Sequence, residues 1–301
     1  KGLRVRHELL LIYSQSSFFA PLSGCGGLRR RNILPFSFRR GTRMTACSMV
    51  EGGTSPASLR PTLTFVLVHG AWHGGWCWRP VQDILTASGC RVFAPSLTGV
   101  GDRAHLFSKD ISLQTHVDDV LSLIEAEELK DFVLVGHSYG GLVITGVADI
   151  LRERVSHYVY LDASLPDDMS PGASFGWSDS NSAELREARL KAVREQGGGV
   201  RLPPPPPDAF AVTEGSDFAW VQRRLGPMPL QTYLGKITLK NKGSAGLRRT
   251  YIAAVRPPYL PLVATHERVQ ADRSWSFTTI EAGHDAMITA PAELSSLLME
   301  A

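Results

Sequence analysis

The chain alternates short apolar runs with stretches in which apolar residues recur at helical spacing. Each run has the length of a buried strand. Residues 112–129 illustrate the helical type, because Val117, Val120 and Ile124 share one face behind the capping Ser112. The expected strands cover residues 63–70, 90–96, 132–136, 155–163, 248–255 and 274–283, and the expected helices cover 76–89, 112–129, 141–153 and a last segment after Pro291. This alternation predicts an α/β fold with a mostly parallel central sheet and helices on both faces.

The composition changes between the fourth and fifth expected strands. Residues 165–247 contain Gly197–Gly199, the run Pro203–Pro207 and two short helical segments. A region of this kind is typical of an insertion that carries its own helices. We therefore expect a core formed by residues 61–164 and 248–301, with residues 165–247 as an inserted helical cap.

The first 60 residues form a leader that differs in charge from the rest. Residues 1–50 hold nine Lys or Arg and one acid, a net charge of +8, whereas the rest of the chain holds 23 bases and 28 acids, a net charge of −5. The leader fits sequence upstream of a natural start at Met44 or Met49, an Arg-rich transit peptide, or a signal ending at Cys25. On each interpretation it lies outside the fold, and the basic overall charge does not indicate a nucleic-acid partner.

The composition also argues against a membrane-spanning protein and against a cysteine-based metal site. No apolar run reaches about 18 residues, so no membrane span is expected. The four cysteines, Cys25, Cys47, Cys77 and Cys90, form neither a CxxC motif nor a Cys/His metal spacing. We expect no metal and no organic cofactor, and free thiols favour a reducing, cytoplasmic location.

The stretch "FVLVGHSYGG" (132–141) surrounds one hydroxyl, Ser138, with three glycines. A strand that ends directly in a helix makes a sharp turn and projects its middle residue outward. Gly136 and Gly140 permit a close backbone approach there. The backbone N–H of Tyr139 then lies at a helix N-terminus, where the helix dipole favours negative charge. The stretch predicts a nucleophilic serine beside half of an oxyanion hole.

Three motifs together resemble the α/β-hydrolases, in particular an esterase and hydroxynitrile-lyase-like group that includes plant methylesterases and small bacterial esterases. They are "FVLVHGAWHGGWCW" (65–78), "VGHSYGG" (135–141) and "AGHDAM" (282–287), and the resemblance covers roughly residues 62–300. It implies the α/β-hydrolase fold. It also implies that the N–H of Ala71 is the second oxyanion donor, while His69 is expected to be a structural hydrogen-bonding residue.

The general base must be a histidine on a loop that returns to the same sheet edge as Ser138. Of the nine histidines, His284 follows the last expected strand, where the chain order serine, acid, histidine places the base. The acid is less clear. The strand 248–255 runs into Arg256 and two prolines with no carboxylate, whereas Asp162 stands at the carboxyl end of the strand before it. Asp162 is therefore favoured, with Glu267 and then Asp272 as alternatives.

These residues predict a serine esterase that cleaves small to medium hydrophobic or aromatic esters through an acyl-enzyme. The lyase of the same fold is the main alternative, but it needs a lysine where this chain has Asp285 and a threonine where it has Gly70. A non-catalytic ligand-binding protein on the same scaffold is the third alternative. The expected partner is a small-molecule ester, and the candidate pocket residues are Trp72, Thr98, His105, Trp177 and Trp220.

Overall fold

The central feature is a six-stranded sheet in which every neighbouring pair of strands is parallel. The computed structural model describes residues 62–213 and 215–300, so the predicted leader lies outside the described residues. The strand order is β10-β9-β4-β3-β1-β2. The strands are β1 (Thr64–Val68), β2 (Arg91–Phe93), β3 (Phe132–His137), β4 (Val155–Leu161), β9 (Arg249–Ala254) and β10 (Ser276–Ile280). The predicted α/β class and parallel sheet are confirmed.

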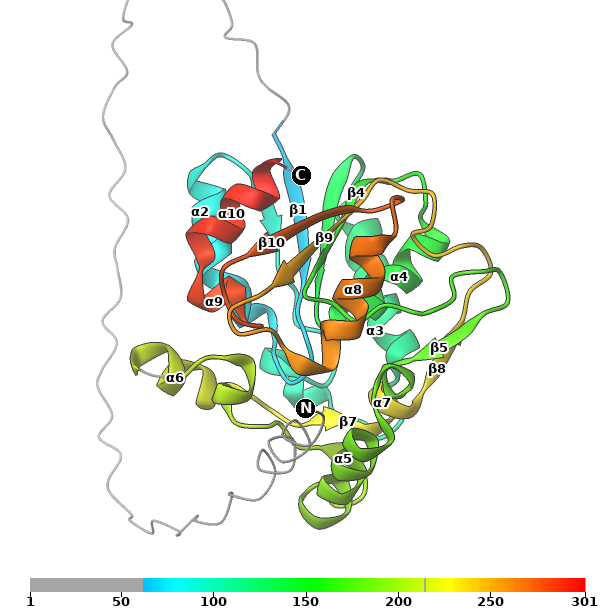
Figure 1. Cartoon of the computed structure of the whole chain (residues 1–301), viewed down its shortest axis with the longest axis vertical. Coiled ribbons are helices and arrows are strands. Elements are labelled where there is room, and N and C mark those ends of the chain that lie inside the picture. Colours follow the sequence, from blue (N-terminus) through cyan, green and yellow to red (C-terminus); the bar gives the residue numbers. More distant parts are fainter. Residues whose placement is uncertain (1–61, 214, 301) are drawn as a thin grey trace, which may run out of the picture. The chain divides into compact units, whose positions relative to one another are not determined.

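Helices cover both faces of this sheet (Figure 1). They are α2 (Arg79–Ala87), α3 (Leu113–Ala126), α4 (Gly140–Ile150), α8 (Val263–Ala271), α9 (Ala286–Thr289) and α10 (Pro291–Glu300). Strand β1 shows how the two cores arise. Phe65 and Leu67 point into the cluster beneath α2 and α10, whereas Val66 and Val68 point into the cluster beneath α3 and α4. Successive side chains of a strand point to opposite faces, so a continuous apolar run serves two cores.

The region between β4 and β9 lies beyond the carboxyl ends of the strands, below them in Figure 1. Its elements are β5 (Ser174–Gly176), η3 (Trp177–Ser180), α5 (Ala183–Gln196), β6 (Arg201–Leu202), η4 (Pro207–Phe210), α6 (Gly215–Gln222), β7 (Met228–Pro229), α7 (Leu230–Leu234) and β8 (Lys236–Thr238). The antiparallel pairs β5–β8 and β6–β7 were not expected. Two or three residues are too few to produce a strand pattern in sequence. The exact division into core and cap stays a prediction.

No helix among the described residues combines the length and the hydropathy needed to cross a membrane.

Candidate active site

Ser138 occupies the turn between β3 and α4, and its backbone is held in the left-handed region with φ +53°. An L-residue in this region is strained by roughly 1–2 kcal/mol. Three backbone hydrogen bonds hold the turn: Ser138 N–H donates to Leu161 O at 3.1 Å, and Ser138 O accepts from Gly141 N–H and Ser164 N–H. The turn therefore fixes one orientation of the Ser138 side chain, which is 9% exposed.

Two glycines allow the turn to pack this closely. A Cβ on Gly136 would lie 2.6 Å from Gly140 O, and a Cβ on Gly140 would lie 2.8 Å from the carbonyl oxygens of Val68 and His69. Backbone atoms cannot move aside as a side chain can. The predicted reason for glycine at both positions, a close backbone approach, agrees with these distances.

The three residues predicted to form a catalytic relay meet at the carboxyl edge of the sheet. His284 Nε2 lies 2.9 Å from Ser138 Oγ, and His284 Nδ1 lies 2.5 Å from Asp162 Oδ2. If Nδ1–H donates to the carboxylate, Nε2 is free to accept the serine proton. Asp162 follows β4, is fully buried and also has a left-handed backbone, with φ +40°.

Asp162 accepts more hydrogen bonds than the one from His284. His266 on α8 donates from Nε2 to Oδ1 at 2.6 Å, and Ala254 N–H donates to the same oxygen at 3.2 Å. Burial alone would raise the pKa of Asp162, but the hydrogen bonds from His266 and His284 outweigh it and lower the pKa to about 2. The carboxylate is therefore ionised and fixed in orientation.

His266 was not predicted to take part in this cluster. The sequence places it on a helix like many other histidines, and no motif distinguishes it. The only available signal is indirect, since α8 follows β9 and so begins near the carboxyl edge of the sheet. The alternative acids do not join the cluster. Glu267 is exposed on α8, and the exposed Asp272 accepts a hydrogen bond from Ser274 N–H.

The loop after β1 lies directly against Ser138. A Cβ on Gly70 would be 2.9 Å from Ser138 Cβ. His69 Nε2 accepts from Leu97 N–H at 3.0 Å, so its Nδ1 carries the proton and donates to Gly70 O at 2.8 Å. Burial lowers the pKa of His69 to about 3, which keeps the ring neutral. The structural role expected for His69 agrees with these bonds.

His69 also fixes the orientation of the Ala71 amide. The C=O and N–H of one planar trans peptide point in opposite directions. Because Gly70 O accepts from His69, the N–H of Ala71 points to the other side of the loop. Tyr139, the other expected donor, is the N-cap residue of α4, and its buried hydroxyl is hydrogen-bonded to His116 Nδ1 at 3.0 Å.

Aromatic rings surround the three relay side chains. Trp72 and Trp177, two of the predicted pocket residues, contact each other edge to face, with their ring centroids 5.2 Å apart. Phe210, one of several aromatic residues of the inserted region, and Tyr259, which was not predicted, have ring centroids 5.9 and 4.0 Å from that of His284. Both come from segments distant in sequence, η4 and the loop after β9, so no local pattern marks them.

The other three predicted pocket residues have different contacts. Thr98 donates from its backbone N–H and its hydroxyl to Asp119, and Trp220 packs against Trp76. His105 is exposed on η2 (Gly101–Leu106). Sequence pattern alone does not show which way side chains point on elements as short as η2 and α6 (Gly215–Gln222).

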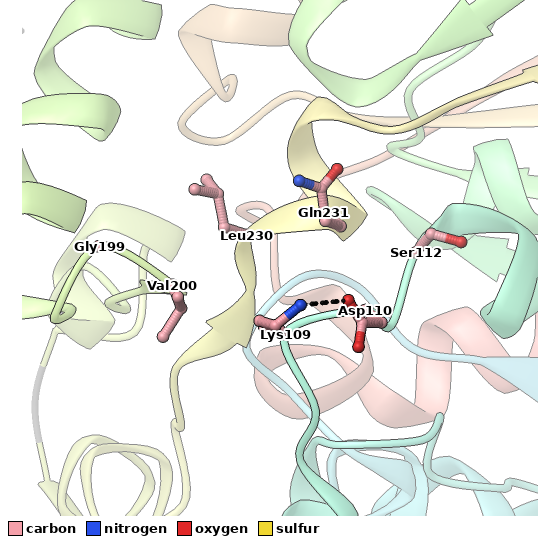
Figure 2. A pocket seen from close by; sticks show the side chains of 7 residues that line it. All are labelled: Lys109, Asp110, Ser112, Gly199, Val200, Leu230 and Gln231. Carbon is pink, nitrogen blue, oxygen red and sulfur yellow. Dashed lines mark hydrogen bonds and ion pairs between the residues drawn. The ribbon is translucent and has the colours of Figure 1, made fainter.

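A surface pocket of about 310 Å³ lies apart from Ser138, between the loop before α3 and the inserted region (Figure 2). Lys109, Asp110, Leu230 and Gln231 are among its lining residues, and Lys109 Nζ donates to Asp110 Oδ1 at 2.8 Å. None of the relay residues lines this pocket. Within residues 62–213 and 215–300, no three His, Cys, Asp or Glu side chains are grouped to hold a metal ion.

The parallel sheet and the side chains at its carboxyl edge define the general class of the protein, an α/β-hydrolase. The alpha/beta hydrolase family model matches residues 65–297, and the chain belongs to this family. The resemblance inferred from the three motifs is confirmed.

Named relatives agree with the esterase group. The chain is 40% identical over 237 residues to a carbendazim hydrolyzing esterase of Nocardioides sp. (strain SG-4G), covering 78% of this chain and 97% of the relative. It is 28% identical over 257 residues to methylesterase 10 of Arabidopsis thaliana, covering 78% and 90%. An extracellular alpha/beta-hydrolase from a Paenibacillus species shares the fold, with a TM-score of 0.68, 24% identity and coverage of 79% and 98%.

Proposed function

We propose that this protein is a serine hydrolase that cleaves carboxylic esters through an acyl-enzyme intermediate. One observation carries the proposal: a serine hydroxyl, an imidazole and a buried carboxylate are connected by contacts of 2.9 and 2.5 Å. An imidazole in this position activates a hydroxyl that is otherwise a poor nucleophile. The esterases among the relatives support ester bonds as the target.

Acylation begins when Ser138 Oγ attacks the ester carbonyl and His284 Nε2 takes its proton. The backbone N–H groups of Ala71 and Tyr139 stabilise the tetrahedral oxyanion, each by roughly 3–4 kcal/mol. His284 then protonates the departing alcohol. Asp162 stays ionised and holds the imidazole in the tautomer that accepts the serine proton.

Deacylation repeats these steps with water. His284 Nε2 takes a proton from the water as it attacks the acyl carbonyl, and the same two amides stabilise the second oxyanion. Ser138 leaves with the proton returned from His284. All groups return to their starting protonation state, and no cofactor enters either half-reaction.

The rings near His284 indicate the substrate class. Trp72, Trp177 and Phe210 are buried and in mutual contact or in contact with His284, and Tyr259 stacks on the same imidazole. Apolar and aromatic walls favour acyl or alcohol groups of the same character. The protein therefore acts on small to medium hydrophobic or aromatic esters.

The alternative functions are less well supported. A cyanohydrin-cleaving lyase of this fold needs a cation next to the base, whereas Asp285 follows His284 here and is paired with the buried His73. A binding protein without catalysis needs no activated hydroxyl. Cytoplasmic location and the absence of a nucleic-acid partner stay predictions, supported by the free thiols of Cys77 and Cys90 and by the acidic charge of residues 51–301.

A substrate panel tests the proposal. The protein should hydrolyse p-nitrophenyl esters, aryl esters or carbendazim, and Ser138→Ala should lower kcat by about 10⁴-fold or more. Ser156→Ala is the matched control, since its hydroxyl only donates to Phe132 O on the neighbouring strand. Release of cyanide from mandelonitrile without ester cleavage would identify a lyase, and inactivity on every ester would identify a binding protein.

The identity of the acid has its own test. Asp162→Asn should lower kcat about 10⁴-fold, because an amide favours the wrong imidazole tautomer. Glu267→Gln should leave kcat unchanged, since Glu267 is exposed. A loss in Glu267→Gln without a loss in Asp162→Asn would contradict the assignment.

A further inference from the structure

A second imidazole–carboxylate pair lies beside the relay and has no part in the proton transfers described above. His73 Nε2 lies 3.0 Å from Asp285 Oδ2, and the two side chains are 1% and 0% exposed. His73 belongs to the loop after β1, while Asp285 directly follows His284 and precedes α9. The pair therefore connects the loop that carries Ala71 to the turn that carries the base, across 212 positions of sequence.

The hydrogen bonds of His73 indicate a charged ring. Its second nitrogen, Nδ1, lies 2.7 Å from the carbonyl oxygen of Ala71. A carbonyl and a carboxylate both only accept, so both ring nitrogens must donate, which requires the imidazolium form. Burial alone would lower the pKa of His73, but the charge and hydrogen bond of Asp285 and the bond to Ala71 outweigh it and raise the pKa.

Three titratable side chains around the pair are neutral. Burial, as the largest cause, lowers the pKa of His69 and of His137 to about 3, and it raises the pKa of the Cys77 thiol. Burial by itself would raise the pKa of Asp285, but His73 outweighs it and the pKa is lowered. His284 is the remaining neighbour. His73 and Asp285 therefore form an ion pair beside the oxyanion loop.

The hydrogen bond from His73 is one of three that the carbonyls of the oxyanion loop accept. The carbonyls of residues 70–72 accept in turn from His69 Nδ1, from His73 Nδ1 and from Gly226 N–H. Trp72 has φ +64°, a conformation that is costly for a tryptophan and persists only where its surroundings impose it. The three donors thus fix the orientation of each of these carbonyls, and the N–H of each peptide points away from its own carbonyl.

We propose that His73 and Asp285 form a positioning pair that holds the oxyanion loop in register with the turn of His284. This inference rests on the proposed ester hydrolysis. Its chemical consequence is that the Ala71 amide is placed for the tetrahedral oxyanion and not for the planar substrate carbonyl. Loss of the pair then weakens transition-state binding and leaves substrate binding almost intact.

Asp285→Asn removes the charge and keeps the shape of the side chain. It should lower kcat roughly 10–100-fold while KM changes by less than about threefold, because small misplacements of catalytic groups have effects of this size. In the variant, the carboxylate that raises the pKa of His73 is absent, so His73 should be neutral at neutral pH. In the wild type, His73 loses its proton, and the ion pair is lost, when the pH rises above the raised pKa of His73. The difference in kcat between the wild type and Asp285→Asn should therefore become smaller at alkaline pH.

Inhibitors separate positioning from general stability. Phenylboronic acid, which forms a tetrahedral adduct with a serine, should bind Asp285→Asn more weakly by the factor lost in kcat, whereas benzyl alcohol should bind both proteins equally. Asp149→Asn is the matched control. Asp149 is a buried carboxylate that accepts from Lys240, Asn241 and Gly243 N–H near the far end of α4, and its loss should not change boronate affinity.

Unchanged boronate affinity in Asp285→Asn would overturn the inference, as would equal losses for both inhibitors. If this variant does not fold, nitrogen-15 NMR of His73 in the wild type decides. Two protonated ring nitrogens at neutral pH support the pair, and a single neutral tautomer contradicts it. A wild type inactive on all esters would refute the proposed function. An active wild type with a fully active Asp285→Asn would refute only the positioning role.

Discussion

At the scale of single residues, the candidate site is built from backbone conformations that side chains disfavour. Trp72, Ser138 and Asp162 all lie in the left-handed region, with φ values of 64°, 53° and 40°. Each costs roughly 1–2 kcal/mol. Hydrogen bonds from distant residues compensate, as when Gly226 N–H donates to Trp72 O and Asp162 N–H donates to Ile252 O. In each of the three residues, the left-handed backbone conformation positions a side chain or an amide for the proposed reaction.

The low pKa of Asp162 predicts a specific dependence of stability on pH. Its value is about 2 in the folded protein, against an ordinary value of 3.8. A carboxyl whose pKa is lowered by folding stabilises the folded protein at pH values above its ordinary pKa. This stabilisation is lost as the pH falls through the pKa of the folded state. Between pH 5 and pH 2, the free energy of unfolding should therefore fall by about 2 kcal/mol more in the wild type than in Asp162→Asn.

Urea denaturation at pH 5, 4, 3 and 2 measures this difference. Glu267→Gln serves as the control, because Glu267 is an exposed carboxylate on the helix that carries His266. Parallel curves for the wild type and Asp162→Asn would show that the bonds from His266 and His284 do not hold the carboxylate ionised.

At the scale of elements, the turn between β3 and α4 determines where the serine lies. Gly136 ends the sheet pairing of β3 with β1, and Gly140 begins α4. Contact between the two glycines brings the strand and the helix together at the turn. The N-terminus of α4 then faces the same edge as Ser138, and its dipole favours the developing oxyanion.

Gly136→Ala should therefore destabilise the protein by about 2–3 kcal/mol and abolish most activity, since its Cβ would meet a backbone oxygen at 2.6 Å. Gly172→Ala is a demanding control: Gly172 is exposed, has φ +87°, and a Cβ there meets nothing within 4 Å. It should cost only about 1 kcal/mol and leave activity intact. Urea denaturation and kcat for one ester measure both. Wild-type activity in Gly136→Ala would contradict the geometry of the turn.

At the scale of the whole molecule, the region between β4 and β9 covers the relay. Phe210 packs near His284, and its carbonyl accepts from Asp285 N–H at 3.3 Å. His284 is 2% exposed and Ser138 is 9% exposed. A substrate larger than water must displace part of this cover before it reaches Ser138, so we expect residues 203–212 to limit access for bulky esters.

Phe210→Ala should shift substrate preference toward bulky esters. The ratio of kcat/KM for p-nitrophenyl octanoate to that for p-nitrophenyl acetate should rise at least roughly tenfold, because a ring is removed from the path. Phe218→Ala is the control, since Phe218 packs on the opposite core cluster beneath α2 and α10. An unchanged ratio in Phe210→Ala would show that this segment does not control entry.

The sequence by itself determined the features that depend on local pattern. Short apolar runs and helical spacing predicted the parallel sheet and its helices, and the glycines around Ser138 predicted a sharp strand-to-helix turn. The order of segments along the chain indicated His284, because a strand near the C-terminus returns to the same sheet edge. These are properties of neighbouring residues or of chain order, and both are visible in one dimension.

Only the tertiary structure decided which distant side chains meet. Asp162 and not Glu267 faces His284, because the end of β4 points to the shared edge while Glu267 lies on the outer side of α8. His266, Phe210 and the pair of His73 with Asp285 each reach the site across about 70 to 210 positions. Contacts of this kind depend on packing between elements, and packing leaves no periodic signal in the sequence.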